Sequence, residues 1–360
     1  MLLDIATASP PYKVPQKKVA DELKLRMGGR TAIGRMIEAV SNNSGIDYRY
    51  FVIPDGEENA DSKFFTDKKG FLKPDTKTRM KAYESWSKLL TGEAVEKLLN
   101  TNNINPLTIG RLITISCTGF YAPGFDYYLI NKFNIPADVK RTHIGFMGCA
   151  ASLIGLNSSI EAMNTLGENK NILMVSTEIC SIHFQVEPTK DNILANLIFG
   201  DGAAAVLFSN DSSRSGLRII ETASFLFNGS AEYMGWEIGN FGFEMILSQE
   251  LPKIILEQAM PRLKLILLDM GIRKEEIKYW ALHPGGRAIL DSMQKGLELT
   301  DEAMIPSRAV LKNYGNMSSV SILFVLKEIM NNNKIGKGDY CCAIAFGPGL
   351  TMEVALLKGN

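Results

Sequence analysis

Phe146-Met147-Gly148-Cys149-Ala150-Ala151-Ser152 contains a single cysteine, and a strand pattern changes into a helix pattern at that residue. Residues 139–146 read as a short extended run, and apolar residues then recur at helical spacing until Gly167. Cys149 is therefore predicted at a helix N-terminus, where unpaired backbone N–H groups and the helix dipole favour a thiolate. Its small neighbours leave room for a substrate. This placement suits a nucleophile.

The composition is that of an ordinary globular enzyme. The 360 residues include 39 Lys+Arg and 39 Asp+Glu, so the net charge gives no case for a nucleic acid or an acidic membrane surface as partner. The N-terminus lacks the features of a signal peptide, and the apolar runs are far shorter than the ~18 residues of a membrane span. We therefore expect a cytoplasmic protein.

The cysteines and histidines predict neither disulfides nor a metal. An odd count of five cysteines without a secretory signal argues for reduced thiols. None of the three histidines forms a zinc-type spacing with another histidine or a cysteine. We expect no metal site.

Strands alternate with helices throughout, which indicates an α/β fold in layers. Pro15 precedes a helix whose expected apolar face includes Val19, Leu23 and Leu25, residues 52–76 read as a surface excursion, and residues 313–316 as a loop. Residues 209–216 are the best linker candidate. The alternation of strands and helices that precedes this segment is found again after it. Two similar halves are plausible. Strands are expected at 2–7, 112–116, 171–176, 203–208, 217–227, 277–282, 340–346 and 351–357, and helices at 78–99, 125–133, 251–270, from 288 and at 318–330.

A cysteine nucleophile needs a base and a group that stabilises an oxyanion. His283 is the best base, because it ends an apolar strand and precedes a Pro-Gly-Gly turn that lets its ring project into a cavity. Asn316 precedes a helix start, where asparagine is usually a cap or turn residue, but its amide could also stabilise an oxyanion. Cys117, Cys180 and His183 follow strand ends and are as consistent with packing as with a pocket.

Cys149, His283 and Asn316 are compatible with two different enzymes. The first is a cysteine peptidase, since the separation 283 − 149 = 134 falls within the ~130–150 of papain-like enzymes. That family, however, carries its cysteine near the mature N-terminus in a different local sequence. The spacing match is coincidental. The second is a decarboxylating condensing enzyme.

The segments Met-Gly-Cys-Ala-Ala at Cys149, Leu-His-Pro-Gly-Gly at His283 and Asn-Tyr-Gly-Asn-Met-Ser-Ser at Asn316 resemble the catalytic segments of type III polyketide synthases. This is the chalcone and stilbene synthase superfamily, and the short cysteine segment looks bacterial rather than plant. The resemblance implies a thiolase-like αβαβα layered fold of two similar halves, with residues 1–212 carrying the cysteine and residues 213–360 carrying the histidine and asparagine. Further matches lie at residues 6–11, 118–124, 176–179, 197–205 and 346–350.

The resemblance implies an acyltransferase that works by iterative condensation. Cys149 takes an acyl group from a starter acyl-CoA, and His283 and Asn316 bind the malonyl-CoA carbonyl and stabilise the enolate formed as carbon dioxide leaves. Cyclisation then gives a pyrone, a resorcinol or a phloroglucinol-type product. No permanently bound cofactor and no metal are implied.

The resemblance also assigns positions around the cavity. Phe199 matches the junction between CoA tunnel and cavity, Met245 a second gatekeeping position, and Trp236 (or Gly235, if the alignment shifts by one) the starter pocket. Ala122 matches a loop that crosses into the neighbouring subunit, which implies a homodimer. Cavity-lining positions match Cys117, Thr118, Cys180, His183 and Ser318.

Several residues depart from the family pattern. Ala39 and Asn43 stand where plant enzymes carry basic residues for the CoA phosphates. Arg30, Arg35 or Arg287, with Ala288 beside it, are expected to hold CoA instead, unless an acyl carrier protein delivers the starter. In addition, His183 replaces a small hydroxyl residue and Ala345 replaces a glycine, so plant substrate specificity is not carried over.

Two alternatives stay open at this stage. A ketoacyl-ACP synthase III has the same three residues but performs one condensation per cycle, and the Met-Ser-Ser and Gly-Pro-Gly-Leu signatures argue against it. A non-catalytic thiolase-fold scaffold belongs to a different class, and the intact set of three residues argues against it.

Overall fold

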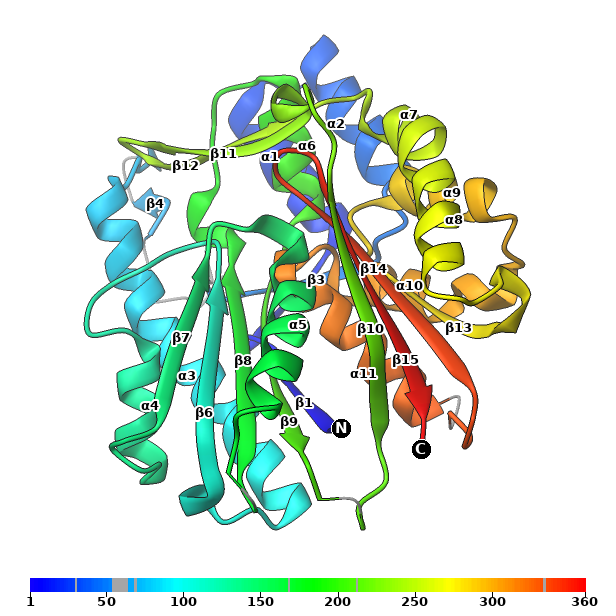
Figure 1. Ribbon diagram of the computed structural model, residues 1–360. Helices are drawn as coiled ribbons and strands as arrows, with labels where there is room; N and C mark the ends of the chain where they lie inside the picture. The colour runs from blue at the N-terminus through cyan, green and yellow to red at the C-terminus, as the bar shows by residue number, and fades with distance from the viewer. Residues whose placement is uncertain (30, 54–63, 68–69, 168, 212, 333–334) are drawn as a thin grey trace.

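A nine-stranded sheet in the order β13-β14-β15-β10-β1-β9-β8-β6-β7 forms the centre of the protein. The computed structural model describes residues 1–360 apart from 30, 54–63, 68–69, 168, 212 and 333–334 (Figure 1). The sheet strands are β1 (Leu2–Ala8), β6 (Ile109–Ser116), β7 (Lys140–Gly145), β8 (Asn171–Ile179), β9 (Asp201–Ser209), β10 (Leu217–Leu226), β13 (Ile277–Leu282), β14 (Tyr340–Gly347) and β15 (Thr351–Gly359).

Helices surround this sheet, and three small two-stranded sheets lie outside it. The helices are α1 (Gln16–Met27), α2 (Ala32–Asn43), α3 (Thr76–Asn102), α4 (Phe125–Phe133), α5 (Ala151–Met163), α6 (Lys190–Ile198), α7 (Leu251–Ile254), α8 (Met260–Asp269), α9 (Arg287–Leu297), α10 (Asp301–Tyr314) and α11 (Ser321–Asn332). These small sheets are β2 (Tyr12–Pro15) with β3 (Tyr48–Phe51), and the two hairpins β4 (Thr66–Asp67) with β5 (Gly70–Phe71) and β11 (Met234–Gly239) with β12 (Gly242–Leu247).

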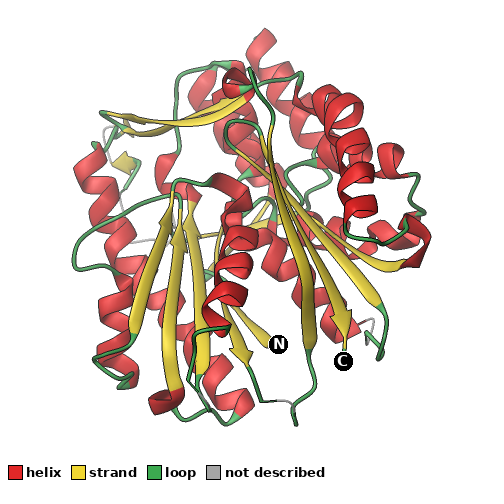
Figure 2. Ribbon diagram, viewed as in Figure 1, coloured by secondary structure: helices red, strands yellow, loops and turns green. Residues whose placement is uncertain are grey.

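The sheet has two wings that meet at a single residue pair. β1 and β10 pair only through Leu2 and Leu217. The first wing is β7-β6-β8-β9-β1 and the second is β10-β15-β14-β13. Helices α5 and α11 each contact strands of both wings and so lie between them, whereas α3 covers the first wing and α10 contacts β13 (Figure 2). Helix and sheet layers alternate, as the predicted layered fold requires.

Close packing of α5 on the first wing positions the segment that precedes this helix. Every residue of β8 and of β9 is buried, as expected for strands covered on both faces. Gly155 in α5 allows the helix to approach, because a Cβ there would lie 2.5 Å from Ile115 Cδ1 and 2.7 Å from Met174 Sδ. The start of α5, and Cys149 just before it, is therefore fixed against the sheet.

Most expected elements are present, and the differences have physical reasons. Leu25, predicted on the apolar face of α1, is 75% exposed. The hairpin β11–β12 and helices α6 and α10 were missed, since glycines interrupt the hairpin strands and Pro306 lies inside α10. Residues 313–314, expected in a loop, end α10. Part of the excursion expected at residues 52–76 lies outside the described residues.

Two absences hold for the part of the chain that the structure describes. No helix there is long and apolar enough to span a bilayer. No three side chains of the His, Cys, Asp and Glu types gather there as a metal site. The division into residues 1–212 and 213–360 stays a prediction.

Candidate active site

Cys149 lies in a short 3-10 turn, Gly148–Ala150, directly before α5. The turn requires glycine at position 148, where φ is +61° and a Cβ would lie 2.2 Å from Pro348 Cδ. Gly347 is also closely packed, because a Cβ there would lie 2.8 Å from the Met147 carbonyl oxygen. The turn between β14 and β15 in the second wing therefore rests on the cysteine turn of the first.

Burial governs the protonation of Cys149. Its thiol is 9% exposed and its Sγ lies 3.7 Å from Ser318 Oγ. Burial raises the pKa of the thiol to about 12, although hydrogen bonds with Ser318 and Asn316 lower it. The helix N-terminus alone therefore does not produce the thiolate that the sequence position favours.

Asn316 is fixed by its backbone and by its side chain. Its N–H donates to the Ile198 carbonyl at 2.8 Å, and its carbonyl accepts from Gly200 N–H at 2.9 Å. The side-chain Oδ1 accepts from Ser318 N–H at 2.8 Å, and Nδ2 donates to the Gly285 carbonyl at 3.2 Å. An amide carries two N–H donors, so a second one is left for a ligand or for Cys149.

His283 follows the last residue of β13 and is 2% exposed. Its backbone is held by the Ile344 carbonyl, which accepts from His283 N–H at 2.9 Å. Neither ring nitrogen has a hydrogen-bond partner among the described residues. Burial lowers the pKa of the ring to about 3, so it is uncharged. An unpaired buried imidazole costs free energy, and such exceptions call for an explanation such as a catalytic role.

The three predicted catalytic residues are linked by a chain of contacts. Cys149 contacts Ser318, whose N–H donates to Asn316, and Asn316 donates to Gly285. Gly285 in turn donates its N–H to the His283 carbonyl at 2.9 Å. The link between Cys149 and His283 therefore runs through Ser318, Asn316 and Gly285, with no hydrogen bond to the His283 ring. Residues distant in sequence thus meet at one place.

Glu178 is a buried carboxylate next to this series of contacts. It lies in residues 176–179, which resemble the family, but the resemblance assigned it no role. It is 0% exposed, and it accepts from Cys117 N–H at 2.9 Å and from Thr118 Oγ1 at 2.8 Å. Ser319 Oγ also donates to it. Burial raises the pKa of Glu178, and these hydrogen bonds lower it. Cys117 and Thr118, predicted to line the cavity, are thus engaged in this network and are fully buried.

An apolar pocket begins at Phe199, whose backbone pairs with Asn316, and none of Cys149, His283 and Asn316 lines it. Hairpin β11–β12 forms one wall, and its register places Trp236 directly opposite Met245. The pocket extends away from the predicted catalytic residues toward α1, where Lys18, Glu22 and Arg26 line it. Five of the predicted substrate positions line this pocket: Cys180, His183, Phe199, Trp236 and Met245.

Phe243 also lines the pocket, and sequence reasoning missed it. A signal was available, because Phe243 precedes Met245 by two residues and side chains two apart in a strand share a face. Its ring stacks on His183 with centroids 4.2 Å apart and lies 5.4 Å from the ring of Phe146. Phe146 belongs to the cysteine segment, so the hairpin touches the segment that carries Cys149.

The predicted CoA residues lie on the surface. Arg287 and Ala288 are exposed at the start of α9, and Arg287 lies against Gly45 just beyond the end of α2. Arg287 Nε is 3.7 Å from Asp291 Oδ2. Arg35 is exposed on α2, and Arg30 lies outside the described residues. Nothing in this geometry assigns them a ligand.

Ala122, predicted to reach a second subunit, is exposed and precedes a cis peptide bond to Pro123. Phe120, nearby in the same segment, is 52% exposed. An exposed apolar segment is compatible with a subunit contact.

Two family models match the chain in adjacent parts. Residues 65–222 match the model described as FAE1/Type III polyketide synthase-like protein. Residues 219–360 match the C-terminal domain of chalcone and stilbene synthases. Together the two models cover residues 65–360.

Whole-length relatives agree with these matches. The chain is 28% identical to 1,3,6,8-tetrahydroxynaphthalene synthase of Streptomyces peucetius subsp. caesius, over 98% of this chain and 92% of that protein. It is 28% identical to the alpha-pyrone synthesis polyketide synthase-like Pks18 of Mycobacterium tuberculosis, over 97% of this chain and 88% of that protein. Among solved structures, PKS-I from the brown alga Ectocarpus siliculosus superimposes with a TM-score of 0.93 at 27% identity, covering 100% of this chain and 98% of that one.

Proposed function

Because the chain belongs to the chalcone and stilbene synthase family of type III polyketide synthases, we propose that Cys149, His283 and Asn316 carry out its iterative condensation. The family predicted from the motifs is confirmed, and with it the acyltransferase class and the thiolase-like fold. The contact chain from Cys149 through Ser318, Asn316 and Gly285 to the His283 loop is the observation that supports these roles.

The first step loads the starter onto Cys149. The Sγ–H proton passes to a ring nitrogen of His283, and the thiolate attacks the thioester carbonyl of the starter. The CoA thiolate then leaves and recovers the proton, which gives an acyl-cysteine and free CoA. Burial opposes a lone thiolate and a lone imidazolium alike. Transfer of the proton creates both charges together, and their attraction offsets part of the desolvation cost.

The second step forms the nucleophile by decarboxylation. The thioester carbonyl of malonyl-CoA accepts hydrogen bonds from Asn316 Nδ2 and from an N–H of the His283 ring. Loss of carbon dioxide leaves an enolate whose oxygen these donors stabilise in a site shielded from water. The enolate carbon attacks the acyl carbon, the Cys149 thiolate leaves, and the lengthened chain is transferred back to Cys149 for the next cycle.

The apolar pocket walled by hairpin β11–β12 receives the acyl group. Its walls include the aromatic rings of Phe199, Trp236 and Phe243 and the thioether of Met245, which suit an apolar chain. The named products of the relatives, a tetrahydroxynaphthalene and an alpha-pyrone, are cyclised. We extend this to a pyrone, resorcinol or phloroglucinol-type product here.

The remaining assignments follow the family. Arg35, Arg287 and Ala288 would border the CoA entrance, with a carrier protein as the other source of the starter. Ala122 would contact the second subunit of a homodimer, and the enzyme would act in the cytoplasm. The two halves would divide at residues 212 and 213.

Product analysis tests the proposed function. The enzyme is incubated with malonyl-CoA and acyl-CoA starters of graded length, beside the Cys149→Ala variant, and the products are identified by mass spectrometry. Products extended more than once by the wild type and absent from the variant support the proposal. A single extension would assign a ketoacyl synthase activity instead. If neither CoA starters nor carrier-bound starters give any product, the proposed function is rejected.

A further inference from the structure

Arg49 is a buried arginine to which the proposed reaction assigns no role. It lies on β3 and is 1% exposed. Its Nη1 donates to the Asn196 carbonyl at 2.8 Å and to the Phe199 carbonyl at 2.6 Å. Its Nε donates to Gln16 Oε1 at 3.0 Å, whereas Nη2 has no hydrogen-bond partner among the described residues. The guanidinium is therefore oriented by the hydrogen bonds of Nε and Nη1.

The C-terminal turn of α6 depends on Arg49 and Gln16. The last carbonyls of a helix have no partner within the helix, and a cation beside them is favourable. Arg49 binds the carbonyls of Asn196 and Phe199, and Gln16 Nε2 donates to the Leu197 carbonyl at 2.7 Å. Three of the four carbonyls of residues 196–199 are thus bound by two side chains that lie close together in the fold.

The fourth of these carbonyls, that of Ile198, accepts from the backbone of Asn316. The Asn316 N–H donates to it at 2.8 Å, and Gly200 N–H donates to the Asn316 carbonyl at 2.9 Å. These two hydrogen bonds form the bridge that pairs Phe199 with Asn316. The backbone that carries the Asn316 amide is therefore set by the same turn that Arg49 holds.

Arg49 also packs against the residue that precedes Asn316. Gly315 has φ +69°, and a Cβ there would lie 2.7 Å from Arg49 Cδ and 2.7 Å from the Ile198 carbonyl oxygen. The chain at Gly315 therefore has no space to move toward α6 while Arg49 is present. Removal of the guanidinium would open this space and would also release carbonyls next to the one that Asn316 binds.

The buried carboxylate of Asp201 partly offsets the charge of Arg49. Asp201 is 0% exposed and accepts from Val52 N–H at 2.8 Å and from Ser181 N–H at 2.8 Å. Burial lowers the pKa of Arg49 to about 9, and the charge of Asp201 raises it. The guanidinium is therefore still charged near neutral pH. Hydrogen bonds from a charged donor are stronger than those between neutral groups, so the turn is firmly held.

We propose that Arg49 is a positioning residue that places the Asn316 amide for the decarboxylation of malonyl-CoA, by holding the turn of α6 to which Asn316 is bonded. The inference rests on the proposed function for its effect on decarboxylation, but not for its effect on the structure around Asn316. Cys149 is fixed through the β14–β15 turn and His283 through β14. Loading of the starter onto Cys149 therefore does not depend on Arg49.

Three variants weaken this arrangement to different degrees. Arg49→Met removes the charge and every donor but keeps an unbranched apolar side chain. Arg49→Lys keeps a charge and an ammonium group that can still donate to carbonyls, without the fixed fork of the guanidinium. Gln16→Leu removes the acceptor of Arg49 Nε and the donor to the Leu197 carbonyl, and it leaves the bonds of Arg49 Nη1 in place.

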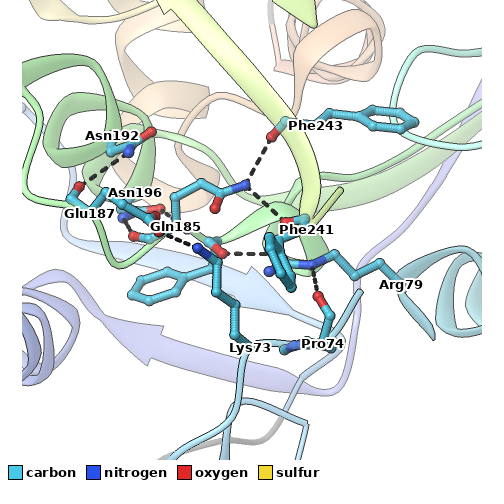
Figure 3. Close-up of polar contacts among 10 residues, drawn as sticks. Lys73, Pro74, Arg79, Gln185, Glu187, Asn192, Asn196, Phe241 and Phe243 are labelled. Carbon is cyan, nitrogen blue, oxygen red and sulfur yellow. Dashed lines mark hydrogen bonds and ion pairs between the residues drawn. The ribbon is translucent and has the colours of Figure 1, made fainter. Parts of the chain in front are cut away.

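Arg79→Met is the matched control. Arg79 is also 1% exposed, and its Nη1 also donates to two carbonyls, those of Ile182 at 2.6 Å and Phe184 at 2.9 Å. Its Nε donates to the Pro74 carbonyl at 2.9 Å, as Figure 3 shows. None of these acceptors is bonded to Asn316. The two methionine variants should therefore lose similar amounts of stability, but only Arg49→Met should disturb Asn316.

Hydrogen–deuterium exchange of the peptide covering residues 314–320 tests the placement of Asn316 without any need for activity. We expect exchange roughly five- to tenfold faster in Arg49→Met, as for the loss of one hydrogen bond, a smaller increase in Gln16→Leu, and wild-type exchange in Arg79→Met. Wild-type exchange in Arg49→Met, or equal acceleration in Arg79→Met, would overturn the inference. Global unfolding is recognised by faster exchange in β8 as well. In that case Gln16→Leu decides, and wild-type exchange in that variant would overturn the inference.

The formation of acetyl-CoA from malonyl-CoA tests the consequence. Arg49→Met should lower kcat of this decarboxylation roughly 100-fold, as for a misplacement of about 1 Å, with KM nearly unchanged. Arg49→Lys should recover part of the loss, and Arg79→Met should keep the wild-type kcat. The rate at which a starter acylates Cys149, followed by intact-protein mass spectrometry, should be similar in all of these variants. Equal losses of decarboxylation and acylation in Arg49→Met would overturn the inference.

Combination with Asn316→Ala distinguishes positioning from a general structural effect. Arg49→Met should lower decarboxylation little further once the Asn316 amide is absent, because residues that act through one group are not additive. Equal fold losses with and without Asn316 would overturn the inference, as would wild-type decarboxylation in Arg49→Met. Absence of both acetyl-CoA and polyketides from the wild type would instead reject the proposed function, and the exchange result would still decide whether Arg49 places Asn316.

Discussion

Gly148 and Pro348 lie so close that a Cβ on Gly148 would be 2.2 Å from Pro348 Cδ. One residue precedes the candidate nucleophile in the first wing, and the other forms the turn between β14 and β15 in the second. Cys149 is therefore placed by a contact between the two wings as well as by its own helix.

We expect Gly148→Ala to destabilise the protein by about 2–5 kcal/mol, because it adds left-handed backbone strain to an overlap with Pro348. The turn must shift, and misplacement of Cys149 by about 1 Å would lower kcat roughly 100-fold. Thermal unfolding and polyketide formation measure both effects. Gly229→Ala is the control, since Gly229 has φ +71° but nothing within 4 Å of a Cβ. Equal losses in the two variants would contradict the importance of the Pro348 contact.

Cys149→Ala should abolish acyl loading but retain decarboxylation of malonyl-CoA. The donors proposed for the enolate are Asn316 and His283, and neither requires the thiol once malonyl-CoA is bound. Formation of acetyl-CoA from malonyl-CoA is the measurement, beside the search for an acyl-enzyme by intact-protein mass spectrometry. Loss of decarboxylation together with loading, in a variant that melts like the wild type, would refute this division of roles.

His283→Gln should slow alkylation of Cys149 near neutral pH. Burial raises the pKa of the thiol to about 12, so without a proton acceptor the thiolate fraction is small and grows about tenfold per pH unit below that value. The rate of alkylation by iodoacetamide should therefore rise steadily from pH 7 to pH 10 in the variant. At pH 7 the wild-type rate should exceed that of the variant. The modified residue is identified by peptide mass spectrometry, because four other cysteines are present. Identical pH profiles would show that His283 does not take the proton.

Asn316→Asp should lower decarboxylation by about 10²–10³-fold while leaving loading nearly intact. The carboxylate keeps the acceptor for Ser318 N–H but replaces the Nδ2 donor with an oxygen that repels the enolate. Asn316→Ala serves as the second variant, since it removes the donor without adding a charge. Decarboxylation at the wild-type rate in both variants would exclude Asn316 as a stabiliser of the enolate.

The local features of this protein could be predicted from its residues alone. Strand, tight turn and helix around Cys149, and the strand that ends at His283, follow from periodicity and from glycine and proline positions, which act over a few residues. The motifs around Cys149, His283 and Asn316 were sufficient to predict the family.

The surroundings of these residues depend on long-range packing and could not be predicted from local patterns. The burial that raises the pKa of the Cys149 thiol depends on every segment packed against it, and no local pattern contains that information. Thr118 and His183 were both expected in the cavity wall, and the structure adds that Thr118 is hydrogen-bonded to Glu178 and His183 to Phe243. These partners lie far apart in sequence, and hydrogen bonds between them exist only because the packing of the sheet and the hairpin brings them within about 3 Å of each other.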